Sequence, residues 1–134
     1  MARNYDDLQQ SYGRCLRNRD FIARFYEIFL ASHPAVPPMF AKTDFAQQRL
    51  ALRRGISMGI AFAAGSDIVR RGIVEMAQAH ARAGRTPVEP SLYAYWTDSL
   101  LKAVAENDAQ ADAKLLSRWR EAMTIVTRHF AERY

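Results

Sequence analysis

Apolar residues recur at intervals of three and four along almost the whole chain. At the start they form two series, Tyr5, Leu8, Tyr12, Cys15 and Leu16, followed by Phe21, Ile22, Phe25, Tyr26, Phe29 and Leu30. Such spacing places apolar side chains on one face of a helix. Asp20 is a suitable N-cap for the second helix, which we expect to end where His33 precedes Pro34.

Further helices are predicted after an irregular, proline-rich corner at residues 34–40. Thr43 or Asp44 can cap the first of them, and a Gly-Ser-Asp sequence ends it. The next helix carries His80 and is expected to end at Gly84. The helix after that follows a loop framed by prolines and carries Leu92, Tyr93, Trp96, Leu100, Ala103 and Val104. The last helix follows an Asn-Asp break and carries Leu115, Leu116, Trp119, Met123, Val126 and Phe130. No run alternates with period two, so the prediction is an all-α fold of six to eight helices.

Length and composition fit one globular domain, which we expect to span residues 1–134. No apolar run approaches the roughly 18 residues of a membrane span, and the N-terminus lacks the apolar region of a signal peptide. A cytoplasmic location without membrane contact is therefore expected.

The basic residues do not form a nucleic-acid surface. Lys and Arg number 19 against 14 Asp and Glu, a net charge of +5. Pairs such as Arg53-Arg54 and Arg70-Arg71 lie far apart, and no aromatic residues are interleaved with them. We interpret these charges as solvated helix faces and expect no nucleic-acid partner.

His80 is the candidate for chemistry. It follows Ile73, Met76 and Ala77 at helical spacing, so its imidazole is expected on an apolar helix face. A buried imidazole needs a hydrogen-bond partner or a metal, and a helical protein can use one to hold a haem iron. A satisfied core histidine is the alternative. Cys15 is the single cysteine, so neither an intrachain disulfide nor a c-type haem attachment is expected.

Several residues, in their order and spacing, resemble the bacterial globins. These are Phe25-Tyr26, Pro34, Phe40, the run Gln48-Arg49-Leu50-Ala51-Leu52, His80, and Pro90-x-x-Tyr93 with Leu100-Leu101. The chain is similar over essentially its whole length to single-domain and sensor-type globins and to the haem domain of flavohaemoglobins. The resemblance implies the globin fold, with helices packed at steep angles around a pocket for haem b. In comparison with flavohaemoglobins, the loop between His80 and Tyr93 is longer.

The resemblance also implies roles for individual residues. His80 matches the proximal iron ligand, and Tyr26 and Gln48 match the distal residues beside a bound gas. The other matched residues are Phe40, which would stack on the haem, Leu52, over the open coordination site, and Tyr93 and Trp96, on the proximal side. Independently of the resemblance, the second ring nitrogen of His80 is expected to donate to a helix carbonyl about one turn back, for which Met76 is the candidate. His33 and His129 fall at helix ends and are expected to be surface or capping residues.

These residues predict a haem-b globin that reversibly binds O2, CO and NO, with high oxygen affinity because a phenol and a carboxamide can both donate to a partly negative ligand. One alternative is a gas sensor that signals through a partner protein or a homodimer. Another is an NO dioxygenase, which would need an external reductase because the chain carries no flavin or nicotinamide domain. A globin fold that has lost haem is the third.

Overall fold

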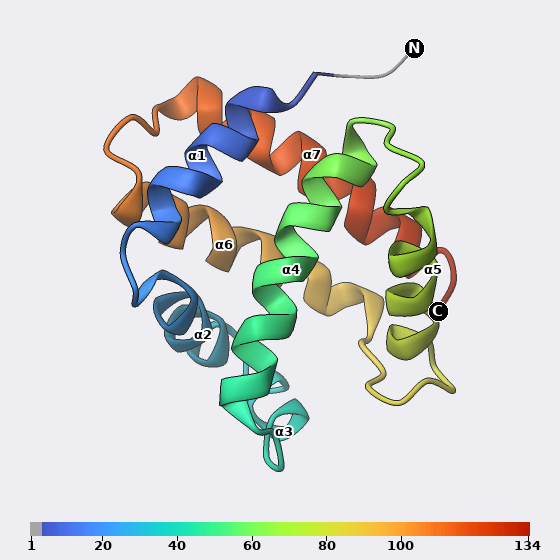
Figure 1. Cartoon of the computed structure of the whole chain (residues 1–134). Helices are drawn as coiled ribbons and strands as arrows, with labels where there is room; N and C mark the ends of the chain where they lie inside the picture. Colours follow the sequence, from blue (N-terminus) through green and yellow to red (C-terminus); the bar gives the residue numbers. More distant parts are fainter. Residues whose placement is uncertain (1–3) are drawn as a thin grey trace.

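The regular structure of this protein is helical (Figure 1). The structure is a computed structural model that describes residues 4–134. Its helices are α1 (Asp6–Leu16), α2 (Phe21–Ser32), α3 (Val36–Met39), α4 (Phe45–Ala63), α5 (Arg70–His80), α6 (Tyr93–Asn107) and α7 (Ala113–Ala131), with a 3-10 turn, η1 (Pro90–Leu92), before α6. No strand forms within residues 4–134, which confirms the all-α prediction.

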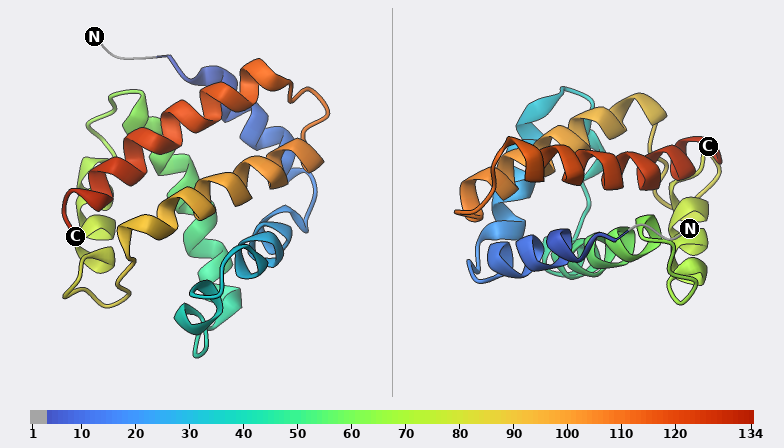
Figure 2. Two further views of the ribbon diagram at one scale, coloured as in Figure 1. Left: turned by 180° about the vertical axis from the view of Figure 1, so that it is seen from behind. Right: turned by 90° about the horizontal axis from the view of Figure 1, so that it is seen from above.

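The helices form two layers, with α1 and α4 in one and α6 and α7 in the other (Figure 2). α2 packs chiefly on α6, α4 packs on α7, and α5 stands at one end of both layers. The largest side chains of the core include Phe21, Phe25, Ile56, Ile60, Leu100 and Trp119. Within the described part of the chain, no helix has the length and hydropathy needed to cross a membrane.

Two carboxylates fix the starts of the long helices. The side chain of Asp44 accepts hydrogen bonds from the backbone N–H groups of Ala46 (3.0 Å) and Gln47 (3.4 Å), so Asp44 rather than Thr43 caps α4. Asp112 caps α7 in the same way by accepting from the N–H of Leu115 (2.8 Å). Both carboxylates also lie at the positive end of a helix dipole.

The proline-rich corner is more regular than expected, because residues 36–39 form α3. Pro37 and Pro38 lie in its first turn, where a helix does not use the backbone N–H groups that proline lacks. The predicted N-cap of α2, Asp20, occupies the capping position, but its side chain makes no capping hydrogen bond. The start of α2 is instead held by Asn18, whose side chain accepts from the N–H of Asp20 (3.0 Å) and whose carbonyl accepts from the N–H of Phe21 (3.2 Å).

α5 ends at His80, and the predicted end at Gly84 is wrong. Ala81 already has extended backbone angles (φ −69°, ψ 164°). The chain then folds back so closely that a Cβ on Gly84 would lie 2.2 Å from the carbonyl oxygen of Gln78. Gly84 is thus required for this close approach and not for a helix C-cap.

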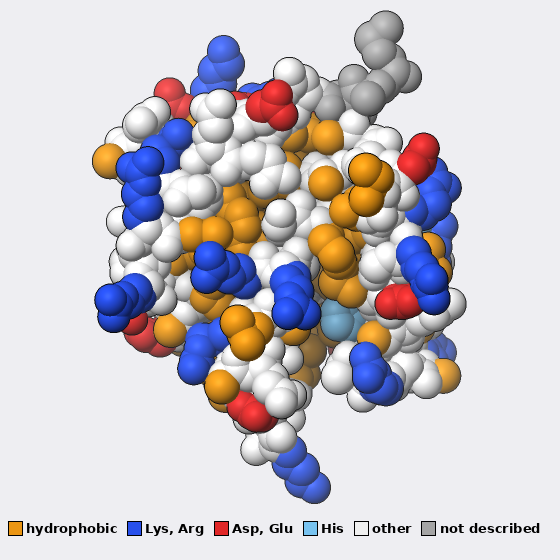
Figure 3. All heavy atoms as spheres, in the orientation of Figure 1, with side chains coloured by type: hydrophobic (Ala, Val, Ile, Leu, Met, Phe, Trp, Pro, Cys, Tyr) orange, Lys and Arg blue, Asp and Glu red, His pale blue; other side chains and the backbone are white. Residues whose placement is uncertain are grey.

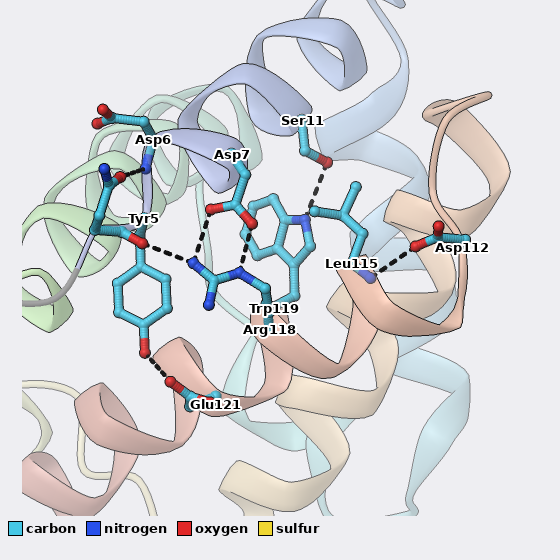
Figure 4. Close-up of polar contacts among 10 residues, drawn as sticks. Tyr5, Asp6, Asp7, Ser11, Asp112, Leu115, Arg118, Trp119 and Glu121 are labelled. Atoms are coloured by element: carbon cyan, nitrogen blue, oxygen red, sulfur yellow. Dashed lines mark hydrogen bonds and ion pairs between the residues drawn. The ribbon is translucent and has the colours of Figure 1, made fainter.

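Polar contacts fasten α1 to α7 (Figure 4). The guanidinium of Arg118 donates to both carboxylate oxygens of Asp7 (2.5 and 3.1 Å), and the hydroxyl of Tyr5 donates to Glu121. The indole Nε1 of Trp119 donates to Ser11 Oγ (3.0 Å) in the buried part of the same interface. These bonds hold together helices from the two ends of the chain.

A buried ion pair continues this interface toward the turn between α6 and α7. Asp108 is 2% exposed and accepts from Arg14 at 2.7 and 2.9 Å and from Ser11 Oγ at 2.6 Å. The backbone N–H of Gln110 donates to the same carboxylate (3.0 Å). The Arg14 guanidinium lowers the pKa of Asp108 to about 2. The charge of Asp108 is therefore fully compensated although it is removed from water.

Candidate functional site

His80 is the last residue of α5 and lies on the helix face that packs against the rest of the molecule. Ile73 and Ala77 on this face are buried, while Met76 and His80 are half-buried. The ring of Phe130 packs edge-on against the imidazole, with 5.7 Å between ring centroids. The apolar face predicted for this helix is thus present, with the imidazole at its edge.

The hydrogen bond of His80 differs from the prediction. Its Nδ1 lies 3.3 Å from both the carbonyl oxygen and the hydroxyl oxygen of Thr86, so the expected bond to the Met76 carbonyl is wrong. Thr86 reaches the ring because α5 stops at His80 and the chain turns back. Within residues 4–134, Nε2 has no hydrogen-bond partner.

Burial lowers the pKa of His80, and the bond to Thr86 only partly opposes this. The ring is therefore neutral near pH 7. A neutral imidazole with a partnerless nitrogen is the form that binds a metal.

A second polar group lies between α2 and α4. Tyr26, which is 5% exposed, accepts a hydrogen bond on its Oη from Gln48 Nε2 (3.1 Å). The rings of Phe40 and Phe45 pack edge-on against the tyrosine at 5.7 and 5.5 Å. Burial raises the pKa of Tyr26 to about 12, so the phenol stays protonated at neutral pH. Its proton is available to a further acceptor, because the bond from Gln48 occupies only the oxygen.

α6 is connected to both groups through neighbouring aromatic rings. Tyr93 and Trp96 are three residues apart and therefore share one face of this helix. Trp96 packs edge-on against Phe25, the neighbour of Tyr26, at 5.9 Å. Tyr93 lies 6.1 Å from Phe130, which in turn contacts His80. One side of α6 thus links the tyrosine on α2 to the histidine on α5.

Leu52 and Met76 continue the apolar lining on α4 and α5. Leu52 follows Gln48 by one helical turn and is half-buried on the same face of α4. The sulfur of Met76 lies 3.6 Å from where a Cβ on Gly55 would stand. A small residue at this point lets α5 pack closely on α4.

The expected pocket residues share an intermediate exposure. The partly buried apolar side chains that pack against the core include Phe40, Leu52, Met76, Tyr93 and Trp96. Beside the N-terminal half of α4, on the side toward α5, the surface is hollowed and shows hydrophobic side chains and a histidine, with Lys and Arg side chains around it (Figure 3). An apolar lining beside a neutral imidazole with a partnerless nitrogen suits a flat apolar cofactor that carries a metal. These residues therefore fit haem.

Three residues near the site were absent from the predicted set. Phe45 is an apolar residue like the predicted pocket residues. Its position directly after the cap Asp44 places it at the start of the helix that carries Gln48, and this could have identified it from the sequence. Phe130 was recognised only as a core position of the last helix. Thr86 carried no signal, because its approach to His80 depends on how the loop folds.

The two other histidines behave differently from each other. His33 ends α2 and accepts a hydrogen bond on Nδ1 from the N–H of Ala35 (2.9 Å), as expected for a capping residue. His129 near the end of α7 is not simply a surface residue. Its Nε2 is buried with no partner among the described residues, and its ring packs edge-on against Phe62 at 5.0 Å.

Comparison with known proteins gives one solved structure with clear similarity. No family model and no curated protein matches the chain. The crystal structure of protein PA3967 from Pseudomonas aeruginosa PAO1 is similar to it, with 38% sequence identity and a TM-score of 0.87 over 96% of each chain. That protein is described as structurally highly homologous to a human hemoglobin. The similarity extends over nearly the whole chain.

Proposed function

The chain belongs to the globin family, and from this we propose that it is a haem-b globin that reversibly binds dioxygen and other diatomic gases. When bound, haem would supply an iron that can bind O2, CO or NO. The observation that carries the proposal is the state of His80. Its Nδ1 is engaged with Thr86, and its Nε2 has no partner among residues 4–134 and belongs to a neutral ring beside half-buried apolar side chains.

In this proposal His80 is the protein ligand of the iron, through Nε2. The edge-on contact with Phe130 limits rotation of the ring. The remaining lining excludes water and presents apolar surface to the cofactor, from Phe40, Leu52, Met76, Tyr93 and Trp96. Burial of that surface contributes roughly 25 cal/mol for each Å² removed from water.

Tyr26 and Gln48 are the proposed gas-binding residues. The amide of Gln48 donates to the phenol oxygen, which orients the hydroxyl and leaves its proton free to donate. A hydrogen bond to a charged group contributes about 1.5–3 kcal/mol, so a gas that gains negative charge on binding is held more tightly. Dioxygen gains such charge and carbon monoxide gains little. We therefore propose preferential retention of oxygen.

The test is haem reconstitution of the purified chain. Addition of hemin to the wild type is expected to give a Soret band, with spectra of ferric, ferrous and carbon monoxide forms typical of a single histidine ligand. His80→Ala is expected to lose or strongly alter these spectra. The control is His33→Ala, which removes a histidine that accepts from the N–H of Ala35 in the turn after α2 and packs against Tyr95. An unchanged Soret band and unchanged spectra in His80→Ala would rule out this ligand.

The physiological role within this proposal is oxygen retention, sensing or nitric oxide removal. Rapid mixing of the oxygenated protein with nitric oxide, with and without an added reductase, separates one-time reaction from turnover. Oxygen-dependent sedimentation tests signalling through a homodimer. Neither alternative has a dedicated feature among the described residues, so simple reversible binding is the function we propose.

A further inference from the structure

The loop that follows α5 makes a set of contacts that converge on His80. The backbone N–H and the hydroxyl of Thr86 both approach the carbonyl oxygen of Ala79, at 2.9 and 3.4 Å. The N–H of Val88 donates to the carbonyl of His80 itself (3.0 Å). Two carbonyls at the C-terminal end of α5, which have no partners within the helix, are thereby satisfied by the loop.

The other side of the same loop contacts Tyr134, three residues after the end of α7. The N–H of Arg82 donates to the carbonyl of Tyr134 (3.1 Å), and its guanidinium lies 4.9 Å from the centre of the Tyr134 ring. Gly84 permits the fold-back, since a Cβ there would stand 2.2 and 2.3 Å from the carbonyl oxygens of Gln78 and Ala79. We call residues 81–88 the clamp loop.

The hydrogen bonds of Thr86 determine which ring nitrogen of His80 carries the proton. Thr86 Oγ1 donates to the Ala79 carbonyl, so toward the imidazole this hydroxyl can only accept. The Thr86 carbonyl is also only an acceptor. Both lie 3.3 Å from Nδ1 of His80, and two acceptors at this nitrogen require it to carry the ring proton. The lone pair is then on Nε2.

We propose that the clamp loop is the device that presents His80 to the iron, with Thr86 as the positioning residue that fixes the Nδ1–H tautomer and the plane of the ring. A donor bond from the far nitrogen increases the electron density of the ligating one and sets its direction. The proposal rests on the proposed haem binding. The tautomer, in contrast, is a property of the protein without haem and can be measured there.

The first experiment is long-range ¹H–¹⁵N correlation NMR of the histidine rings in the full-length chain without added haem. The wild type and Thr86→Ser are expected to show the Nδ1–H tautomer at His80. Thr86→Val, with the same shape but no hydroxyl, keeps one acceptor and should show a mixture. Gly84→Ala should lift the loop and shift His80 to the Nε2–H form. The matched control is Gly13→Ala, because nothing lies within 4 Å of a Cβ at Gly13.

Each result decides for or against the proposal. A predominant Nε2–H tautomer in the wild type would overturn it, as would an unchanged Nδ1–H population in Thr86→Val. If Gly84→Ala fails to fold, which circular dichroism would reveal, Thr86→Val still decides because its backbone contacts are unaltered. Failure of the wild type to bind haem would contradict the proposed function and leave the tautomer result standing.

The second experiment uses the haem-loaded protein. Resonance Raman spectra of the ferrous form should show a lower iron–histidine stretching frequency in Thr86→Val than in Thr86→Ser. Haem transfer to excess apomyoglobin should be faster in Thr86→Val by about three- to tenfold. Removal of a hydrogen-bond partner of a ligating histidine typically lowers metal affinity by about 10- to 100-fold. The effect expected here is at or below the low end of that range because the bond is solvent-exposed. Identical frequencies and transfer rates in the two variants would show that Thr86 does not act on the ligand.

Discussion

At the scale of single residues, the hydrogen bond between Tyr26 and Gln48 bears most directly on the proposed gas binding. Its importance lies in direction: the amide donates and the phenol accepts, so the phenol proton is left for a third group. Burial raises the pKa of Tyr26 to about 12, which keeps that proton in place throughout the physiological range. A phenylalanine at this position would preserve the ring contacts with Phe40 and Phe45 and remove only the donor.

Tyr26→Phe is accordingly expected to speed oxygen dissociation by about tenfold or more, since the loss of a hydrogen bond of about 1.5 kcal/mol corresponds to that factor. Carbon monoxide dissociation should change much less. Stopped-flow replacement of oxygen by carbon monoxide measures the first rate. The matched control is Tyr95→Phe, which removes the hydroxyl of a tyrosine that is 38% exposed and packs against His33. If the variant releases oxygen at the wild-type rate, Tyr26 has no part in retention.

At this scale the sequence was informative about residue types and weaker about partners. The positions of Tyr26, Gln48 and His80 follow from helical spacing and from the resemblance to globins. The partner of His80 did not follow, because a helix carbonyl one turn back and a loop threonine are equally compatible with the sequence. The difference arises from the close fold-back at Gly84, which is a matter of tertiary geometry.

At the scale of the helices, the ion pair between Arg14 on α1 and Asp108 in the turn before α7 can be tested by substitution. Asp108→Asn would leave Arg14 without its carboxylate and weaken the bond from Ser11. We expect a loss of about 2–3 kcal/mol in the free energy of unfolding, below the roughly 3–5 typical of fully buried pairs because the Arg14 side chain is 20% exposed. Urea denaturation followed by circular dichroism measures it.

A suitable control is Asp98→Asn, which breaks an ion pair to Arg120 whose two side chains are each 53% exposed. Exposed pairs contribute about 1 kcal/mol or less, so this variant should stay close to wild type. Equal losses in both variants would mean that the buried network has no special weight.

The helices themselves were largely predictable, because apolar spacing and capping residues are local properties. Asp44 as the cap of α4 is an example. The two errors, the regular turn of α3 and the early end of α5, both concern short segments next to proline or glycine. There the choice between helix and turn depends on contacts with distant residues, such as the bond between the loop after α5 and Tyr134.

For the whole molecule, two partly buried imidazoles, those of His80 and His129, make stability depend on pH. Burial lowers the pKa of His80, and burial together with the nearby Arg133 lowers that of His129, below the ordinary 6.5. Below about pH 6.5 the unfolded chain therefore takes up protons that the folded chain does not, and the free energy of unfolding falls. The contribution of Asp108 acts only at lower pH. It is complete above about pH 4 and is lost as the pH falls toward 2, because its folded pKa is depressed to about 2.

The haem-free protein should consequently be less stable at pH 5.5 than at pH 7.5, as measured by urea midpoints at the two values. His129→Gln should reduce this difference, because glutamine does not take up a proton in this range whereas the unfolded chain protonates His129. A difference that is unaffected by the substitution would assign the pH dependence to other groups.

The positions of the two tryptophans allow their fluorescence to report on cofactor binding and on unfolding. Trp119 is fully buried beside Ser11 in the interface of α1 and α7, so its emission in the haem-free protein follows global unfolding. Trp96 packs against Phe25 within the pocket lining, where an absorbing cofactor would quench it strongly by energy transfer. A single emission spectrum thus combines two signals, cofactor loading and chain integrity, and Trp96→Phe would separate them.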